Sequence, residues 1–209
     1  MGVRKFEDLI GQTEFLELLT GQTAKQARLD LSPLLHKPEA GLHTKLFCSE
    51  GANNPIDNGD LNLKMAADAA AAVASNSSMK LSYSVRNTDR SVGATLSGMI
   101  ALKHGNHGAD DFPINIALKC TVGQSFGVWN AGGLNMTLEG DANDYVGKGM
   151  TGGELVIYPE HQVKFDAHES AIMGNTCLYG ATGGKLLASG RAGERFAVRN
   201  SGAIAVIEG

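Results

Sequence analysis

The sequence predicts a mainly β fold, a β-helix solenoid preceded by a helical and extended lead-in. Three observations predict it. Glycines are few in residues 1 to about 78 and crowd residues 121–209. The second region repeats a short unit at steps near 20 residues, and each unit ends in an alternating apolar run. Short strands joined by glycine corners at such a period are typical of solenoids whose turns stack.

Residues 1–79 are predicted to form the lead-in and to pack on the solenoid. Phe6, Leu9 and Ile10 recur at helical spacing, and Thr13 is placed to cap a second helical turn. The stretch from 20 to 43, interrupted by Pro33 and Pro38, predicts an irregular strap over another surface. The lead-in therefore begins without a long regular element.

A strong helix closes the lead-in. The run LNLKMAADAAAAVA, residues 61–74, is rich in good helix formers, and Asp60 stands where a cap belongs. Its face of Leu61, Met65, Ala69 and Ala72 is predicted to be buried.

Residues 80–209 are predicted to form the β-helix. KLSYSVR (80–86) alternates apolar and polar residues, which predicts a strand. A helix follows, with Val92, Leu96 and Ile100 on one face and Gly105 as its C-terminal cap. A second strand is predicted in FPINIALKC, which precedes the repeats.

Four segments make up the repeat. They are FGVWNAGGLNMTLEG (126–140), YVGKGMTGGELVIYP (145–159), CLYGATGGKLLASG (177–190) and FAVRNSGAIAVIEG (196–209). The last small residues of their corners are 20, 31 and 19 residues apart, at Gly133, Gly153, Gly184 and Ala203. The long step predicts an insertion around PEHQVKFDAHES. Leucine-rich repeats share this period, but their consensus is missing and the units leave no room for a helix. The side chains expected to point inward are Leu155, Ile157, Leu186 and Val206.

The composition excludes several classes of function. Of 209 residues 19% are charged, and the net charge is −4, so neither nucleic acid nor an anionic membrane is indicated as a partner. Cys48, Cys120 and Cys177 lie far apart without a C-x-x-C spacing, which predicts buried thiols in a reducing compartment. No apolar run is long enough for a signal peptide or a membrane span. We therefore expect a cytoplasmic protein.

A nucleotide-binding loop is one interpretation of GKGMTGG (147–153), because it fits the G-x-G-x-x-G pattern. Asp166 lies 19 residues beyond Gly147, near where a ribose-binding acid is expected. A phosphate-binding loop must open a helix, however, whereas Leu155 and Ile157 alternate as in a strand. A backbone corner is the favoured interpretation.

A serine-hydrolase site is a second interpretation, because GQSFG (123–127) fits G-x-S-x-G around Ser125. An acid and a histidine follow in the expected order, taken from Asp141 or Asp144 and from His161 or His168. That motif belongs to a strand-to-helix turn, and no alternation of strands and helices surrounds it here. A solenoid turn is favoured.

Other polar clusters have two interpretations each. The segment HGNHGADD is either an exposed loop or a metal site made of His104, His107, Asp110 and Asp111. Two basic and acidic groups are either local ion-pair and capping networks or surfaces for a partner domain. They are Arg86, Asp89 and Arg90 in RNTDR, and Arg191, Glu194 and Arg195 in RAGER.

Long motifs now suggest a family. RNTDRSVGATLSG, GQSFGVWNAGG, GDANDYVGKGMTGGELVIYP, GNTCLYGATGG and AGERFAVRNSGA closely resemble the C-terminal domain of the glutamate synthase large (alpha) subunit. The similarity includes FEDLIGQTEFLE, LDLSPLL and DNGDLN, so it covers nearly the whole chain. The glycine-corner region alone also resembles a subunit of formylmethanofuran dehydrogenase, and the first 120 residues favour glutamate synthase.

The resemblance implies a right-handed parallel β-helix, truncated at its C-terminal end, that acts as a spacer. It implies glutaminase and synthase domains elsewhere, with FMN, an iron–sulfur cluster and NADPH or ferredoxin serving the whole enzyme in glutamate biosynthesis and ammonia assimilation. No catalytic, cofactor-binding or metal residue is carried over, because the three cysteines match neither the N-terminal nucleophile nor a cluster set. Lys148 and Arg199 remain candidates for contact with the ammonia path or the barrel domain. The open end of the solenoid predicts self-association of the isolated chain.

Overall fold

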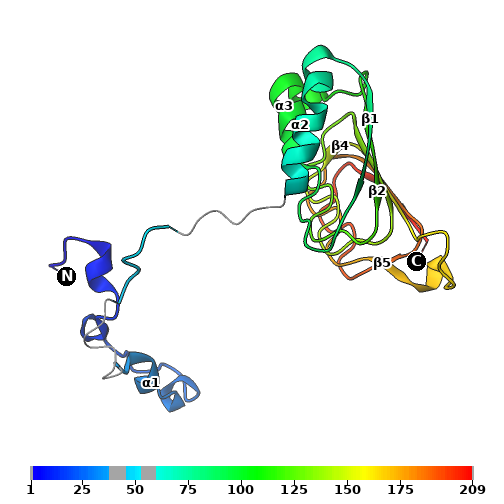
Figure 1. The fold of residues 1–209 in the computed structure, drawn as a ribbon. Coiled ribbons are helices and arrows are strands. Elements are labelled where there is room, and N and C mark those ends of the chain that lie inside the picture. The colour runs from blue at the N-terminus through cyan, green and yellow to red at the C-terminus, as the bar shows by residue number, and fades with distance from the viewer. Residues whose placement is uncertain (1, 38–45, 53–59, 209) are drawn as a thin grey trace. The chain divides into compact units, whose positions relative to one another are not determined.

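The chain forms two compact units, Met1–Pro55 and Ile56–Gly209. The computed structural model describes residues 2–37, 46–52 and 60–208 (Figure 1). The sequence placed the boundary after residue 79, whereas the contacts group the alanine-rich helix before that residue with the second unit. The packing of a lead-in on the repeats stays a prediction.

Among its described residues, the first unit contains only short helices. The predicted first turn forms as a 3₁₀ helix. The second turn also forms, but Thr13 lies inside it and Gln12, not Thr13, is its N-cap residue. None of these helices has a buried residue. Pro38 and the end of the predicted strap lie outside the described residues. The helices are η1 (Phe6–Leu9), η2 (Thr13–Phe15), η3 (Gln26–Arg28) and α1 (Ser32–Leu35).

The second unit begins as predicted, with helix, strand, helix and strand. The alanine-rich helix buries Met65, Ala69 and Ala72, and it begins at Asp60 itself. The second helix ends at Gly105, whose φ of 60° confirms the predicted cap. The elements are α2 (Asp60–Ser75), β1 (Met79–Ser84), α3 (Ala94–His104), η5 (Gly105–His107) and β2 (Ile114–Lys119).

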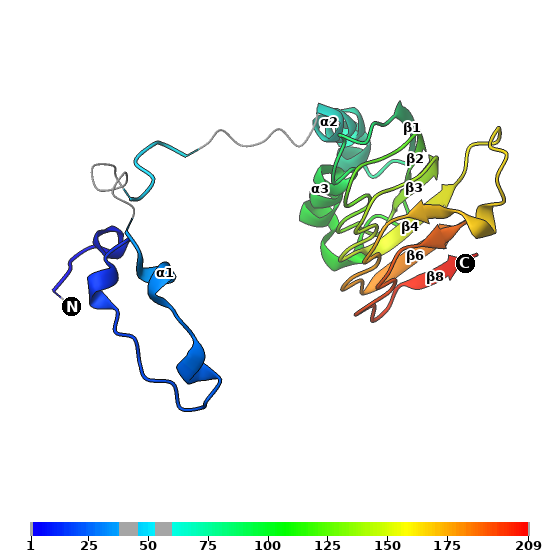
Figure 2. The same ribbon diagram turned by 90° about the horizontal axis from the view of Figure 1, so that it is seen from below.

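The alternating runs of the repeats form further strands of one sheet. Its order is β1-β2-β3-β4-β6-β8, and every neighbouring pair is parallel (Figure 2). The predicted insertion leaves the sheet after Tyr158 and contains only a short helix before a separate two-stranded sheet. The remaining elements are β3 (Leu134–Glu139), β4 (Thr151–Tyr158), η6 (Ala167–Glu169), β5 (Ala171–Met173), β6 (Gly183–Ala188), β7 (Arg191–Ala192) and β8 (Ile204–Ile207).

The prediction of a β-helix solenoid is wrong. The structure is an α/β fold with a parallel sheet of six strands, a separate sheet of two strands and few helices. Between strands the backbone turns through repeated left-handed residues, and alternating left-handed residues cannot extend into long strands. The sequence signal for short parallel strands is therefore real, but the connections add only the short two-stranded sheet β5-β7 and two isolated bridges.

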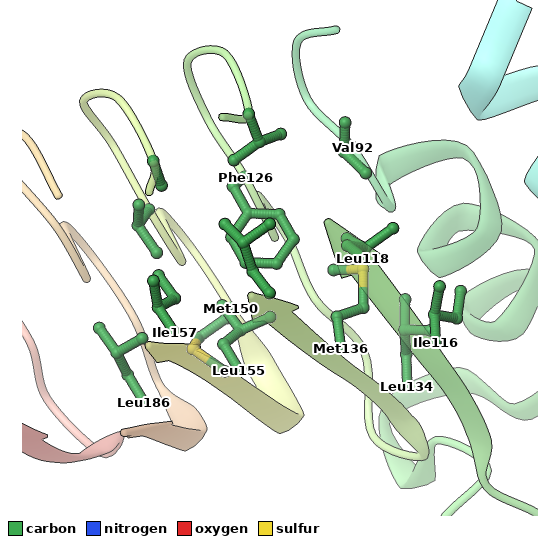
Figure 3. Packing of buried hydrophobic residues seen from close by; sticks show 14 of the residues in the cluster. Val92, Ile116, Leu118, Phe126, Leu134, Met136, Met150, Leu155, Ile157 and Leu186 are labelled. Atoms are coloured by element: carbon green, nitrogen blue, oxygen red, sulfur yellow. The ribbon is translucent and has the colours of Figure 1, made fainter. Parts of the chain in front are cut away.

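The core lies on the inner side of the sheet and continues into the corners and helices. Leu155, Ile157 and Leu186 are fully buried, as predicted (Figure 3). Val206 is 59% exposed, contrary to prediction, because Leu186 pairs with Ala205 and the register turns Val206 to the outer face. Side chains of α2 and α3, including Met65 and Leu96, belong to the same cluster.

Candidate functional site

The corners that precede the strands stack on one another and are joined by backbone hydrogen bonds. Gly147 N donates to Phe126 O at 2.8 Å, Leu178 N to Val146 O at 2.7 Å, and Ala197 N to Cys177 O at 3.0 Å. Gly147, Leu178 and Ala197 therefore occupy the same position in three successive corners. The repeat seen in the sequence is therefore a repeat of backbone position.

Each corner holds three left-handed residues in alternate positions, all with φ between 55° and 68°. The first position is Ser125, Tyr145, Thr176 and Arg195, the second Gly127, Gly147, Leu178 and Ala197, and the third Trp129, Gly149, Gly180 and Arg199. Most of these residues are not glycine. The hydrogen-bonded stack thus imposes the conformation, and glycine is only its least strained occupant.

The backbone amides of GKGMTGG donate hydrogen bonds within the protein. Gly149 N donates to Tyr179 O at 2.9 Å, and Thr151 N to Asn130 O at 2.9 Å. The remaining amides from Gly147 to Gly152 also donate to carbonyl oxygens, and β4 follows the loop. A phosphate site requires backbone N–H groups directed at the ligand. The geometry therefore favours a backbone corner over a nucleotide loop, and Asp166 lies in the insertion before η6.

The residues of the proposed serine triad have other contacts. Ser125 is left-handed and opens a turn, and its amide donates to Asp144 O at 2.8 Å. The Asp144 carboxylate accepts from Asn175 N at 2.8 Å, and the Asp141 carboxylate accepts from the Thr121 hydroxyl at 3.1 Å.

The two candidate histidines lie in the insertion. The His161 ring lies 5.9 Å from the Tyr158 ring, and His168 Nε2 is 4.0 Å from Glu169 Oε1. Among the described contacts, none joins Ser125 to either histidine.

The metal interpretation finds little support. The described side chains contain no group of three or more His, Cys, Asp or Glu that could hold a metal ion. The side chain of His107 lies outside the described residues, so this part of the predicted cluster stays a prediction. The prediction of buried thiols holds for Cys177 but is wrong for Cys48 and Cys120, which are exposed.

The two charged clusters make local contacts. Asp89 caps a turn, since its carboxylate accepts from Arg86 N at 2.7 Å, and Arg90 O accepts from the Asn62 side chain at 2.9 Å. In RAGER, Arg191 Nε donates to His168 O at 2.8 Å, and Glu194 N donates to Asn175 Oδ1 at 2.7 Å. Capping is thus confirmed, whereas the ion pairs predicted within these clusters do not form among the described residues.

A row of aromatic and cationic side chains along the corners was missed. Lys148 Nζ lies 5.4 Å from the centre of the Tyr145 ring, and Arg199 Cζ lies 5.7 Å from that of Tyr179. Trp129 belongs to the same row and is 62% exposed. We call Trp129, Tyr145, Lys148, Tyr179 and Arg199 the corner ridge. The sequence singled out its two cations, but the aromatic partners become visible only when the corners are superimposed.

A cavity of about 300 Å³ lies beside the insertion. It is lined by Cys120, Asp141, Val163, Phe165 and Ile172, among others. Its lining combines apolar side chains with polar ones, among them Glu160 and Ser170.

Stacked left-handed corners that feed one parallel sheet define a glycine-corner repeat domain. The chain belongs to the GXGXG motif family, whose family model matches residues 62–209. Glutamate synthases match the whole chain, including the residues that precede this match. It is 44% identical over 212 residues to ferredoxin-dependent glutamate synthase 2 of Synechocystis sp. and 41% identical over 209 residues to the glutamate synthase [NADPH] large chain of Azospirillum brasilense. It is 39% identical over 213 residues to glutamate synthase [NADH] of Saccharomyces cerevisiae.

These matches cover 100% of this chain but only 13%, 14% and 10% of the respective relatives. The resemblance to glutamate synthase is thereby confirmed, and the chain spans only a small part of the length of these relatives. The relatives are named for three different electron donors. In the described parts of the chain, no helix is long and apolar enough to cross a membrane.

Proposed function

We propose that this chain is a non-catalytic structural domain of glutamate synthase. It holds the glutaminase domain and the FMN and iron–sulfur synthase domain in place while ammonia passes from glutamine to 2-oxoglutarate. The observation that supports this proposal is the use of the corner amides in stacking, in a chain similar over its full length to glutamate synthases. Its partners are other domains of the large subunit, and a cytoplasmic location is part of the proposal.

The cofactors are proposed to lie in other parts of the enzyme. A flavin phosphate is held by amide or cationic donors, and the amides of the corner that best matches a phosphate loop already donate to carbonyls. An iron–sulfur cluster takes several cysteine thiolates, and Cys177 is a buried thiol that donates to Gly174 O at 3.3 Å. The residues present do not fit either group.

A chimera tests the structural role. The chain replaces its matched segment in the Azospirillum brasilense large chain, and a second variant lacks the segment. We expect the chimera to form equal amounts of glutamate by glutamine hydrolysis and by amination of 2-oxoglutarate. The deleted variant is expected to release free ammonia. Unchanged coupling in the deleted variant would refute the proposal.

The free chain provides an independent test. We expect no saturable binding of FMN, NADPH or ATP and no ester hydrolysis. Binding that is lost on Gly149→Val, or hydrolysis lost on Ser125→Ala, would instead support a nucleotide-binding or hydrolytic protein.

We also propose that the isolated chain self-associates through the edge of the sheet. Strand β8 is an edge strand, and its Ile204 and Val206 are each 59% exposed. Exposed apolar edge strands are templates for pairing with another chain. Sedimentation at increasing concentration should show a growing mass, and a protease-resistant monomer at all concentrations would contradict this.

A further inference from the structure

The corner ridge has an exposed tryptophan in a strained position. Trp129 has φ 55° and is 62% exposed. Two of its equivalents, Gly149 and Gly180, adopt the same conformation without the strain of a side chain. A left-handed conformation is unfavourable by roughly 1–2 kcal/mol for a residue with a Cβ. Because Trp129 lies outside the buried core, burial of its side chain does not account for a tryptophan at this position.

Backbone hydrogen bonds join three of the four corners that carry the ridge. Trp129 N donates to Lys148 O at 2.9 Å, and Gly149 N donates to Tyr179 O at 2.9 Å. A Cβ added at Gly149 would lie 2.8 Å from Cδ1 of Trp129, so the indole lies directly against this glycine. A side chain fixed before binding loses little entropy when a partner arrives.

The ridge is locally cationic in a chain of net charge −4. Among the described residues, Lys148 and Arg199 contact aromatic rings and form no ion pair with a carboxylate. The nearby Asp144 carboxylate accepts a backbone hydrogen bond from Asn175, and Glu194 precedes a third cation, Arg195. A carboxylate brought by a partner would therefore meet two cations, Lys148 and Arg199, that form no ion pair among the described residues.

We propose that the corner ridge is a docking surface for an acidic segment of another part of the glutamate synthase large subunit. The proposal rests on the structural role proposed above and deepens it by naming the surface. Trp129 is the apolar anchor, and Lys148 and Arg199 bind carboxylates of the segment. Tryptophan, tyrosine and arginine are the residue types that dominate binding energy at protein interfaces. Opposite charges across the contact fix its register.

Single-stranded nucleic acid also binds aromatic and cationic rows. The composition favours a protein segment, because phosphate backbones are bound by many cations and this chain is acidic overall. Nucleic acid is therefore an outcome of the test and not part of the proposal.

The test uses the single tryptophan as a reporter. The chain is co-expressed with the Azospirillum brasilense large chain lacking the matched segment, and the complex is treated with hydroxyl radicals. We expect oxidation of Trp129, measured by mass spectrometry, to fall about fivefold from the free chain, in line with burial of an interface anchor. The double variant Lys148→Glu, Arg199→Glu should bind at least about tenfold more weakly and restore oxidation.

Two further variants keep the test specific. Trp129→Gly should fold, since glycine adopts this φ freely, and should bind more weakly. Lys80→Glu changes an exposed cation on β1, away from the corners, and should bind normally. Cooperative thermal unfolding of each free variant shows that it is folded.

The outcomes separate the two proposals. A complex in which Trp129 oxidises as fast as in the free chain, with binding unchanged by charge reversal, overturns the ridge and leaves the structural role intact. The absence of any complex with the unchanged chain overturns both. Salt-dependent quenching of Trp129 fluorescence by oligothymidylate, lost on Lys148→Glu, would identify a nucleic-acid surface and overturn the proposed partner.

Discussion

The two compact units differ in what they do with their apolar residues. In Met1–Pro55, the side chains of Phe6, Leu19 and Leu34 are 79%, 84% and 77% exposed. In Ile56–Gly209, Phe126 and Leu155 are completely buried. Apolar residues at regular spacing are thus present in both units. Among the residues that the structure describes, those of the second unit form a core and those of the first do not.

The difference explains where helices form. Short helices are marginal in water, and most helical stability in proteins comes from packing of an apolar face. Residues 61–74 pack such a face into the core of the second unit. They lie in a helix of 16 residues, Asp60–Ser75. The helical pattern that starts at Phe6 yields only turns of four and three residues. Tertiary burial, and not spacing alone, decides which pattern persists.

The largest contrast should come from truncating one leucine in each unit. Leu155→Ala leaves a cavity between strands and should lower the free energy of unfolding by about 3 kcal/mol. Leu19→Ala removes an exposed side chain and should change it by less than about 0.5 kcal/mol. Urea unfolding followed by circular dichroism measures both. Equal losses would show that the first unit has a core of its own.

A second contrast concerns glycines. Gly153 has φ 69°, and a Cβ there would lie 2.1 Å from Leu134 O, so Gly153→Ala should lower the free energy of unfolding by at least about 2 kcal/mol. Gly180 has φ 68° but open space, and Gly180→Ala should cost about 1 kcal/mol. Gly51→Ala in the first unit meets nothing within 4 Å and should be neutral. Urea unfolding measures all three variants. Equal losses of unfolding free energy for Gly153→Ala and Gly180→Ala would show that close stacking at Gly153 does not matter.

Much of the second unit follows from its sequence. Alternation placed all six strands of the main sheet, and Gly105 marked the end of α3, because these signals depend on burial of one face and on a local cap. Val206 was misplaced, since a one-residue shift in strand register reverses the inward face and only the pairing with β6 fixes it.

The architecture and the ridge did not follow in the same way. The β-helix prediction failed because the length of a corner does not show whether the connecting backbone forms a further strand or turns through left-handed residues. Leu178 and Arg199 carry no sequence signal for a positive φ, so three left-handed positions per corner were invisible. The pairing of Trp129 with the Lys148 corner likewise depends on the stacking register.

A smaller contrast concerns one lysine in each unit. Lys103 Nζ donates to Val73 O, Ala74 O and the Asn76 side chain, and thereby joins α3 to the C-terminal end of α2. Lys103→Met should lower the free energy of unfolding by about 1 kcal/mol. Lys37 pairs with the exposed Glu14, and Lys37→Met should leave the unfolding midpoint unchanged. Thermal unfolding measures the stability of both variants. A larger loss of stability in Lys37→Met than in Lys103→Met would contradict the expectation that the lysine of the second unit contributes more.

The smallest contrast is chemical and compares two thiols. Cys177 is buried and Cys48 is exposed. Burial, with a smaller contribution from the Asp144 charge, raises the pKa of Cys177 from 9.0 to about 11. A disulfide reagent such as DTNB, applied near neutral pH, should modify Cys48 at once and Cys177 only as the second unit opens. Equal rates would place Cys177 at the surface.

The raised pKa also fixes the direction of a pH effect. The folded state keeps the Cys177 proton at a pH where the unfolded chain has lost it, so the unfolded state binds fewer protons and stability falls as pH rises. The stabilisation is complete below pH 9 and disappears as pH rises toward 11. Cys177→Ala should flatten this part of the profile of urea midpoint against pH, whereas Cys48→Ala should leave it unchanged. An unaltered slope in Cys177→Ala would show that other groups cause the alkaline loss, and the buried thiol would then not distinguish the second unit from the first.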